Sequence, residues 1–294
     1  MSMTEILASL RANDRERFLF EAGKLDPARL EQANSERYAN WFSGIDATLL
    51  QITSFVRPEF ASIVIDRGAS IDLHSACALG NVKVVQEALE ANPRRVNSAV
   101  SEYFPIQFAL PSADSVRLLL AHGDDPNRRV NRVGWFEWED AAAEQGLASW
   151  TPLHMLALGR GSSPHVDVAE VLRENGAIID ATSSPFGEAP IHLSAIYDRA
   201  NLLRWFVGAG CDVDVPTRES CDGAEEATLY DGALCEPCRL TEGKTPLMLA
   251  LGEGQESAAK TLLALGARVD ARDSSGFTPL HYAAGAFWGE ILWK

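Results

Sequence analysis

The sequence predicts an all-α fold, an α-solenoid in which short pairs of antiparallel helices stack side by side. One phrase recurs along the chain, reading TPLHMLALGRG from Thr151, APIHLSAIYDRA from Ala189, TPLMLALGEGQ from Thr245 and TPLHYAAG from Thr278. Each complete copy leads to a second phrase, which reads LRENGAIIDA, FVGAGCDVDV or LLALGARVDA. Because 46% of the 294 residues are hydrophobic, the copies also have enough apolar surface to bury a core between them.

Each position of the phrase has a structural role in a helix pair. The Thr hydroxyl caps the first helix, and the Pro fits its first turn, where a missing N–H costs nothing. The Gly of the second phrase ends the second helix in a left-handed conformation. The apolar residue after the Pro is expected to point into the stack. The residues at this apolar position are Leu153, Ile191, Leu247 and Leu280.

Weaker copies extend the pattern toward the N-terminus. Two of them begin at Ile71 and Phe104, and a more degenerate one ends at VIDRGASID, residues 64–72. Residues 1–46 do not match the phrase, but they contain two stretches with the apolar faces of helices. We therefore expect a helical N-terminal cap over residues 1–46 and a repeat solenoid over residues 47–294.

The recurring phrase resembles the ankyrin repeat, whose hallmark is T-P-L-H followed by two short antiparallel helices, a Gly-Ala stop and a β-hairpin turn. The resemblance is to ankyrin-repeat proteins of the bacterial type with two enlarged hairpins. It implies about six to seven helix-turn-helix units with β-hairpin fingers. It also implies that the histidine of the phrase hydrogen-bonds the adjoining turn and serves neither catalysis nor metal binding. These histidines are His74, His154, His192 and His281.

The spacing of the copies indicates two insertions. Successive copies begin at Ile71, Phe104, Thr151, Ala189, Thr245 and Thr278, so the first and last steps are equal and the three between them are longer. Most of the excess lies between the helix-ending Gly of one copy and the start of the next. The short form of this connection runs from Gly266 to Thr278, and the two long ones run from Gly123 to Thr151 and from Gly210 to Thr245. The sequence therefore predicts hairpin insertions at about residues 128–149 and 216–243. Insertions of this kind fall on one face of a solenoid, often the binding face.

Aromatic residues in the first insertion either fold back over the stack or stay exposed to hold a partner. In ankyrin-repeat proteins, binding usually involves the hairpin tips and the exposed positions of the first helices. The candidate partner-binding residues are Trp135, Phe136, Trp138 and Trp150 near the first insertion, Leu158, Ile196 and Tyr197 on the first helices, and Tyr230 in the second insertion.

The second insertion contains seven acidic residues and few large apolar ones, so it cannot fold on its own hydrophobic content. Cys235 and Cys238 form a CxxC, a spacing that suits two thiolates on a tetrahedral zinc ion. Cys221 is a candidate third ligand, and Cys211 or an acidic side chain a fourth. A structural zinc, a disulfide and unligated cysteines all remain open. A catalytic zinc is not indicated, because no HExxH or HxE…CxxC arrangement supplies a general base.

Composition and motifs narrow the function. A count of 41 acidic against 26 basic residues argues against nucleic acid and anionic lipid as partners. The N-terminus is unlike a signal peptide and no apolar run reaches the length of a spanning helix, so we expect a cytoplasmic protein. The sequence has no GxSxG elbow, phosphate-binding loop or Rossmann glycine pattern, which argues against an enzyme.

We therefore expect a scaffold that binds a protein or peptide segment on its concave face and its enlarged hairpins, a segment of basic or amphipathic character. One alternative is an enzyme or small-molecule-binding protein whose pocket is built by the two insertions, with or without zinc. Another is an assembly subunit that forms a homodimer through the apolar residues 287–293.

Overall fold

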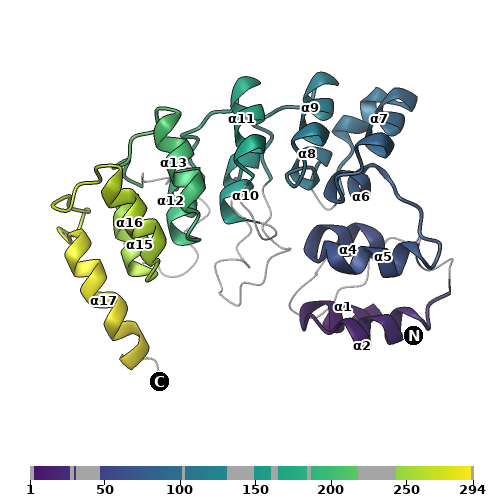
Figure 1. The fold of residues 1–294 in the computed structure, drawn as a ribbon, viewed down its shortest axis with the longest axis horizontal. Coiled ribbons are helices and arrows are strands. Elements are labelled where there is room, and N and C mark those ends of the chain that lie inside the picture. Colours follow the sequence, from purple (N-terminus) through teal and green to yellow (C-terminus); the bar gives the residue numbers. More distant parts are fainter. Residues whose placement is uncertain are drawn as a thin grey trace, which may run out of the picture. The chain divides into compact units, whose positions relative to one another are not determined.

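The computed structural model describes residues 3–26, 30, 47–100, 103–130, 149–159, 165–183, 187–217 and 243–292. The described residues form two compact units, which divide between Pro126 and Asn127. Unit 1 contains the helices up to α9, and unit 2 contains the helices from α10 on (Figure 1).

Unit 1 is built from antiparallel helix pairs. Within each of the pairs α4/α5, α6/α7 and α8/α9 the two helices contact each other, and α6 contacts both α4 and α8. The helices of unit 1 are α1 (Met3–Arg11), α2 (Arg15–Ala22), α4 (Leu49–Val56), α5 (Pro58–Ile65), α6 (Leu73–Ala78), α7 (Val82–Ala91), the 3-10 helix η1 (Pro93–Asn97), α8 (Pro105–Phe108) and α9 (Ala113–Ala121).

The first copy of the repeat begins at Thr48, where hydrogen bonds between Thr48 and Gln51 start the first helix of the copy. The Thr48 hydroxyl accepts a hydrogen bond from the backbone N–H of Gln51, and the Gln51 side chain accepts one from the backbone N–H of Thr48. This reciprocal capping box satisfies two N–H groups that a helix start would otherwise leave without an acceptor. Thr48 and Gln51 therefore start this helix without the Pro and His of the later copies.

The two N-terminal helices pack against each other and against the first copy. Helix α2 contacts α5, where the rings of Phe18 and Phe60 meet edge to face with centroids 5.0 Å apart. Both rings are buried, so this contact covers the outer side of α5 with apolar surface. The cap over residues 1–46 stays a prediction as a whole, since residues 31–46 lie outside the described part of the chain.

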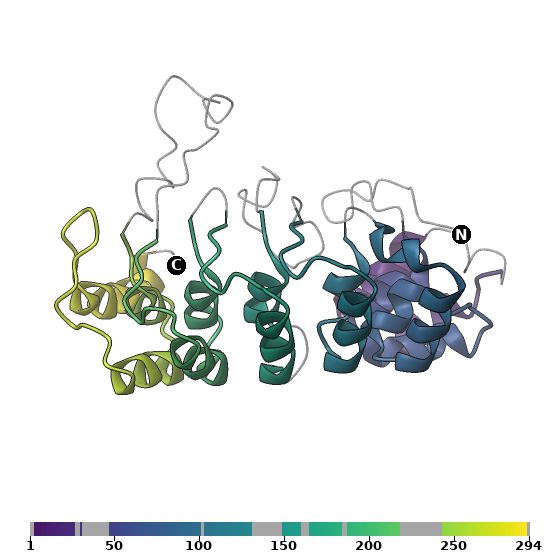
Figure 2. The same ribbon diagram turned by 90° about the horizontal axis from the view of Figure 1, so that it is seen from above.

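Unit 2 repeats the same arrangement. Among the pairs α10/α11, α12/α13 and α15/α16, neighbours contact each other first helix against first helix and second against second, and α17 contacts α15. Figure 2 shows the described segments of the connections between copies leaving the helices of this unit on one side. The helices are α10 (Pro152–Leu158), α11 (Val166–Glu174), α12 (Pro190–Ile196), α13 (Ala200–Gly208), α15 (Pro246–Gly252), α16 (Glu256–Ala264) and α17 (Pro279–Leu292).

The predicted all-α stack is confirmed. The described residues contain six successive helix pairs, and α17 begins a seventh copy, which agrees with the expected six to seven units. No helix among the described residues is long and apolar enough to cross a membrane.

The last copy differs from its sequence-based prediction. The repeat pattern predicts a turn after its first helix, but α17 runs as one helix of 14 residues. In the two preceding copies the chain turns at Asp198 (φ 54°) and at Gly254 (φ 69°). The corresponding position in the last copy is Phe287, and a bulky residue disfavours the left-handed conformation that this turn needs.

Leu280 also departs from its prediction. Leu153, Ile191 and Leu247 point into the stack as expected, each at most 1% exposed, but Leu280 is 74% exposed. The difference follows from position, because α12, α15 and α17 cover the first helices before them and no described helix follows α17.

Candidate functional site

A two-residue contact closes the base of each hairpin in unit 2. In every case the backbone N–H of the first residue donates a hydrogen bond to the carbonyl oxygen of the second residue. The second residue stands directly before the residue that caps the first helix of the next copy. We call these contacts closing pairs. They are Val130/Trp150 (2.9 Å), Ser183/Glu188 (2.7 Å), Thr217/Lys244 (2.9 Å) and Asp273/Phe277 (3.0 Å).

The closing pairs locate the extra residues of the two long connections. In the short connections, residues 184–187 lie between Ser183 and Glu188, and residues 274–276 lie between Asp273 and Phe277. In the long connections, residues 131–149 lie between Val130 and Trp150, and residues 218–243 lie between Thr217 and Lys244. The long connections therefore leave and rejoin the repeat at the same place as the short ones.

The second members of the closing pairs form a row along unit 2, here called the inner row. It consists of Trp150, Glu188, Lys244 and Phe277, which directly precede the capping positions of α10, α12, α15 and α17, and each of these helices contacts the next in this order. Phe277 is 51% exposed, whereas the other three are partly buried. The row thus places a carboxylate and an ammonium group between two aromatic side chains.

The two charged residues of the inner row lie in a partly desolvated environment. Burial raises the pKa of Glu188, and a hydrogen bond of 3.0 Å from the Ser183 hydroxyl to its Oε2 opposes that rise. Burial lowers the pKa of Lys244, against the attraction of the carboxylates of Asp273, Glu188 and Glu253. Because water screens such groups poorly, a partner's charge would interact with them more strongly than at an open surface.

Tyr282 supports Lys244 from the following copy. The Lys244 Nζ lies 5.3 Å from the centre of the Tyr282 ring, and the Tyr282 hydroxyl donates a 2.5 Å hydrogen bond to Asp273 Oδ2. Burial and the neighbouring Asp273 carboxylate raise the pKa of Tyr282. The ring is therefore held in one orientation beneath the ammonium group.

The ends of the first helices hold three further candidate residues. Ile196 and Tyr197 are partly buried at the end of α12, and burial, with Glu253 and Glu188, raises the pKa of Tyr197. The prediction of an exposed Leu158 at the corresponding place on α10 is wrong, because Leu158 is only 5% exposed. Helix α10 packs against both α11 and α12, and the Arg199 guanidinium donates to the Leu158 carbonyl oxygen at 3.0 Å.

The histidines at the fourth place of the phrase hydrogen-bond the start of their own helix and the connection that follows their helix pair. His154 Nδ1 accepts from the Thr151 N–H, and Nε2 therefore carries the proton that it donates to the Glu188 carbonyl oxygen at 3.0 Å. His192 makes the same contacts with Ala189 and Val215. Burial lowers the pKa of His154 and of His192 to about 4, so both are neutral at pH 7. The predicted structural role holds for these two residues.

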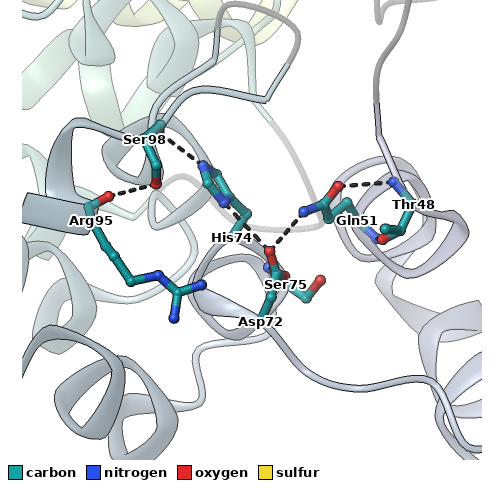
Figure 3. A network of polar contacts seen from close by, with 7 residues as sticks. All are labelled: Thr48, Gln51, Asp72, His74, Ser75, Arg95 and Ser98. Atoms are coloured by element: carbon teal, nitrogen blue, oxygen red, sulfur yellow. Dashed lines mark hydrogen bonds and ion pairs between the residues drawn. The ribbon is translucent and has the colours of Figure 1, made fainter. Parts of the chain in front are cut away.

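His74 in unit 1 bonds the adjoining turn as well, but in a different setting (Figure 3). Its Nε2 lies 3.0 Å from the Ser98 carbonyl oxygen and its Nδ1 lies 3.5 Å from Asp72 Oδ2. Asp72 also caps α6 through the Ser75 N–H and accepts from Gln51 Nε2 at 2.7 Å. Burial raises the pKa of Asp72, but these hydrogen bonds together hold it well below its usual range. The network joins the first copy to the second and holds the turn that follows the second, so it serves the fold.

The proposed metal ligands are described only in part. Cys211 is 6% exposed, and burial, with Asp180 and Asp212, raises the pKa of its thiol to about 11. It occupies the position after the helix-ending Gly, where Ala177 and Ala267 stand in other copies. No group of three potential metal ligands occurs among the described residues. The remaining predicted site residues lie outside the described part of the chain: Trp135, Phe136, Trp138, Cys221, Tyr230, Cys235 and Cys238.

Helix pairs in series, joined by hairpins that close at equivalent residues, define a helical-repeat protein. Comparison with known families identifies the repeat. A model of the ankyrin repeat matches residues 149–184, and a model of three ankyrin-repeat copies matches residues 226–290. The chain is therefore an ankyrin-repeat protein.

Curated relatives match parts of this chain. Rabankyrin-5 of Homo sapiens is 34% identical over 88 residues, which cover 30% of this chain and 7% of the relative. Neurogenic locus notch homolog protein 2 of Homo sapiens is 27% identical over 162 residues, which cover 48% of this chain and 7% of the relative. The chain thus spans about 7% of the length of these curated relatives. Because they are animal proteins, the bacterial type stays a prediction.

Proposed function

We propose that the chain is a protein-binding scaffold whose inner row in unit 2 contacts the partner. Ankyrin repeats in general are protein-binding scaffolds, and the inner row supplies the kind of surface that binding needs. Aromatic side chains act as anchors that gain from desolvation, while a carboxylate and an ammonium group between them select the partner by charge.

The observation that carries this proposal is the regular placement of the four residues. Each precedes a helix-capping position and is fixed by a closing-pair hydrogen bond of 2.7 to 3.0 Å. Neighbouring helices pack about 10 Å apart, so an extended segment of roughly ten residues matches the length of the row. Such a segment meets an aromatic side chain, an acid, a base and a second aromatic side chain in turn.

The two long connections belong to the same proposal. Since they leave the repeat at the closing pairs, we infer that they are enlarged hairpin fingers beside the inner row. The aromatic residues Trp135, Phe136, Trp138 and Tyr230 extend the binding surface in this proposal, and a structural zinc at the second insertion remains one of its three open alternatives. A cytoplasmic location is part of the proposal too.

No observation on the described residues favours an enzyme whose pocket is built by the two insertions. That alternative rests on segments outside the described part of the chain, so we propose a binding function and no catalytic one.

The proposal is tested by selecting peptides on the intact chain. A library of random 12-residue peptides is panned against the immobilised protein, and the affinities of the selected peptides are measured by titration calorimetry. The variant Tyr197→Ala is expected to weaken binding tenfold or more, because it removes a partly buried aromatic side chain beside the row. The control Lys260→Ala, on the second helix α16, is expected to leave binding unchanged. Equal affinities for both variants would contradict the proposal.

A further inference from the structure

Two arginines hold equivalent positions at the bases of the hairpins in unit 2. Arg129 directly precedes the first member of the closing pair that ends at Trp150. Arg272 stands at the same place before the pair that ends at Phe277. In the two pairs between them, whose second members are charged, a threonine and a proline take this place. The arginines therefore accompany the two aromatic residues that begin and end the inner row.

The main chain fixes each guanidinium group. Arg129 Nη1 donates to the carbonyl oxygens of Ser149 at 2.7 Å and Thr182 at 2.9 Å, and to the Ser149 hydroxyl at 3.1 Å. Arg272 Nη1 donates to the carbonyl oxygen of Gly276 at 3.0 Å. Ser149 and Gly276 each directly precede the aromatic residue of their closing pair, so the two arginines use equivalent acceptors. Both groups are thus oriented by backbone carbonyls.

One edge of each guanidinium group stays open to a partner. Both side chains are exposed, and within the described ranges their Nε and Nη2 atoms form neither a hydrogen bond nor an ion pair. The carboxylate of Asp273, next to Arg272, already accepts from the N–H groups of Ser275 and Phe277 and from the Tyr282 hydroxyl. Nε and Nη2 lie on the same edge of the planar group, at a spacing that matches the two oxygens of a carboxylate.

On the basis of the proposed binding function, we propose that Arg129 and Arg272 each bind a side-chain carboxylate of the partner segment. The chain has 41 acidic and 26 basic residues, yet no acid in the described part of unit 2 pairs with either arginine. A carboxylate of the partner supplies the missing charge. Because each guanidinium is already held in place, binding loses little free energy in ordering it.

The spacing of the two arginines defines the partner further. Their hairpins lie three copies apart, and neighbouring helices pack about 10 Å apart, so the two groups are separated by about 30 Å. An extended chain advances about 3.3 Å per residue, which places the two carboxylates roughly nine positions apart. Between them the segment meets Glu188 and Lys244. The partner is therefore an extended segment with an acidic residue near each end, which differs from a segment of basic character.

The first part of the test uses peptides as probes. A library of random 12-residue peptides is panned on the intact chain, and the selected peptides are synthesised with blocked ends, so that only side chains carry carboxylates. Asp or Glu should be enriched at pairs of positions roughly nine apart. Selected peptides without this enrichment would overturn the carboxylate proposal and leave the binding proposal standing. A library from which no peptide binds would overturn both.

The second part separates a contact with the partner from a structural role. Arg272→Gln removes the charge and keeps an amide that can donate to the Gly276 carbonyl oxygen. Titration calorimetry compares each acidic peptide with peptides in which Asn or Gln replaces one end acid at a time. The variant should bind the acidic peptide about tenfold more weakly than the wild type does, but bind one of the two amide peptides as well as the wild type does. Arg129→Gln should do the same for the acid at the other end.

The matched control is Arg268→Gln. Arg268 is exposed in the same connection as Arg272 but already pairs with Asp270 at 3.4 Å, so its loss should leave all these affinities unchanged. Circular dichroism and urea unfolding verify that the variants fold. Equal weakening of acidic and amide peptides by Arg272→Gln would assign the arginine a structural role and overturn the proposal. Unchanged binding of the acidic peptide would overturn it too.

Discussion

The carboxylate of Asp198 accepts a 2.6 Å hydrogen bond from the backbone N–H of Ala258, in the next copy of the repeat. Ala258 lies in the first turn of α16, so the loop of one copy caps the second helix of the next. Asp198 does this from a left-handed conformation (φ 54°), at the position where Gly254 stands in the following copy.

Substitutions at Asp198 should distinguish two contributions to the free energy of unfolding: the hydrogen bond that caps α16 and the left-handed backbone conformation of the residue. Asp198→Gly removes the cap and keeps an easy left-handed turn, so it should cost about 1 kcal/mol of unfolding free energy. Asp198→Ala loses the cap and adds backbone strain, so it should cost about 2 to 3 kcal/mol. Asp198→Asn keeps an acceptor and should be nearly neutral. Urea unfolding measures all three, and equal stability of the Asn and Ala variants would contradict the assignment.

Acid should destabilise unit 2 in a defined pH window. The folded-state pKa of His154 and His192 is about 4, below the ordinary value of 6.5, so unfolding takes up protons between these values. Stability is complete above pH 6.5 and falls as the pH drops to 4, by roughly 3 kcal/mol per histidine.

The matched variant for that experiment is the double substitution His154→Gln and His192→Gln. Gln107 stands at the same place in the copy at Phe104, where its Oε1 accepts from the Phe104 N–H at 2.8 Å. The double variant should lose most of the pH dependence of the urea midpoint between pH 6.5 and 4. An unchanged slope would show that other groups cause the acid sensitivity.

Cys211→Ala should be tolerated. The thiol takes the place of Ala177 and Ala267, and its raised pKa keeps it protonated. We expect unfolding free energy within about 1 kcal/mol of the wild type and the same zinc content, measured by atomic emission. Loss of one equivalent of zinc in this variant would make Cys211 a ligand after all, with Cys221, Cys235 and Cys238 as its partners.

Much of the fold could be predicted because the repeated phrase contains residues that mark where its helices begin. The Thr-Pro pairs at Thr151 and Thr245 mark helices that begin one residue later. The start of the first copy is harder to find, because TLLQ at Thr48 has neither Pro nor His and lies closer to Ile71 than a full repeat length. The signal that could have found it is the Thr48–Gln51 capping box.

Of the inner row, only Trp150 is predicted from the sequence as a binding residue. Trp150, Glu188, Lys244 and Phe277 each directly precede a copy of the phrase, but they share no chemistry, so no motif marks them as a set. The closing pairs, which the sequence does not show, reveal that each is fixed by an equivalent hydrogen bond. The exposure of Leu280 escapes prediction for a related reason, because the phrase is the same in an interior copy and in a copy without a described neighbour, and burial depends on that neighbour.

The most direct test of the binding proposal reverses the polarity of the inner row. In Glu188→Lys with Lys244→Glu the net charge is unchanged, and the reversal of Glu256 and Lys260 on α16 gives a control of the same composition. Peptides selected on the wild type should bind the first double variant at least tenfold more weakly in titration calorimetry and bind the control unchanged. Equal binding to both variants, with both folded, would contradict the claim that the inner row holds the partner.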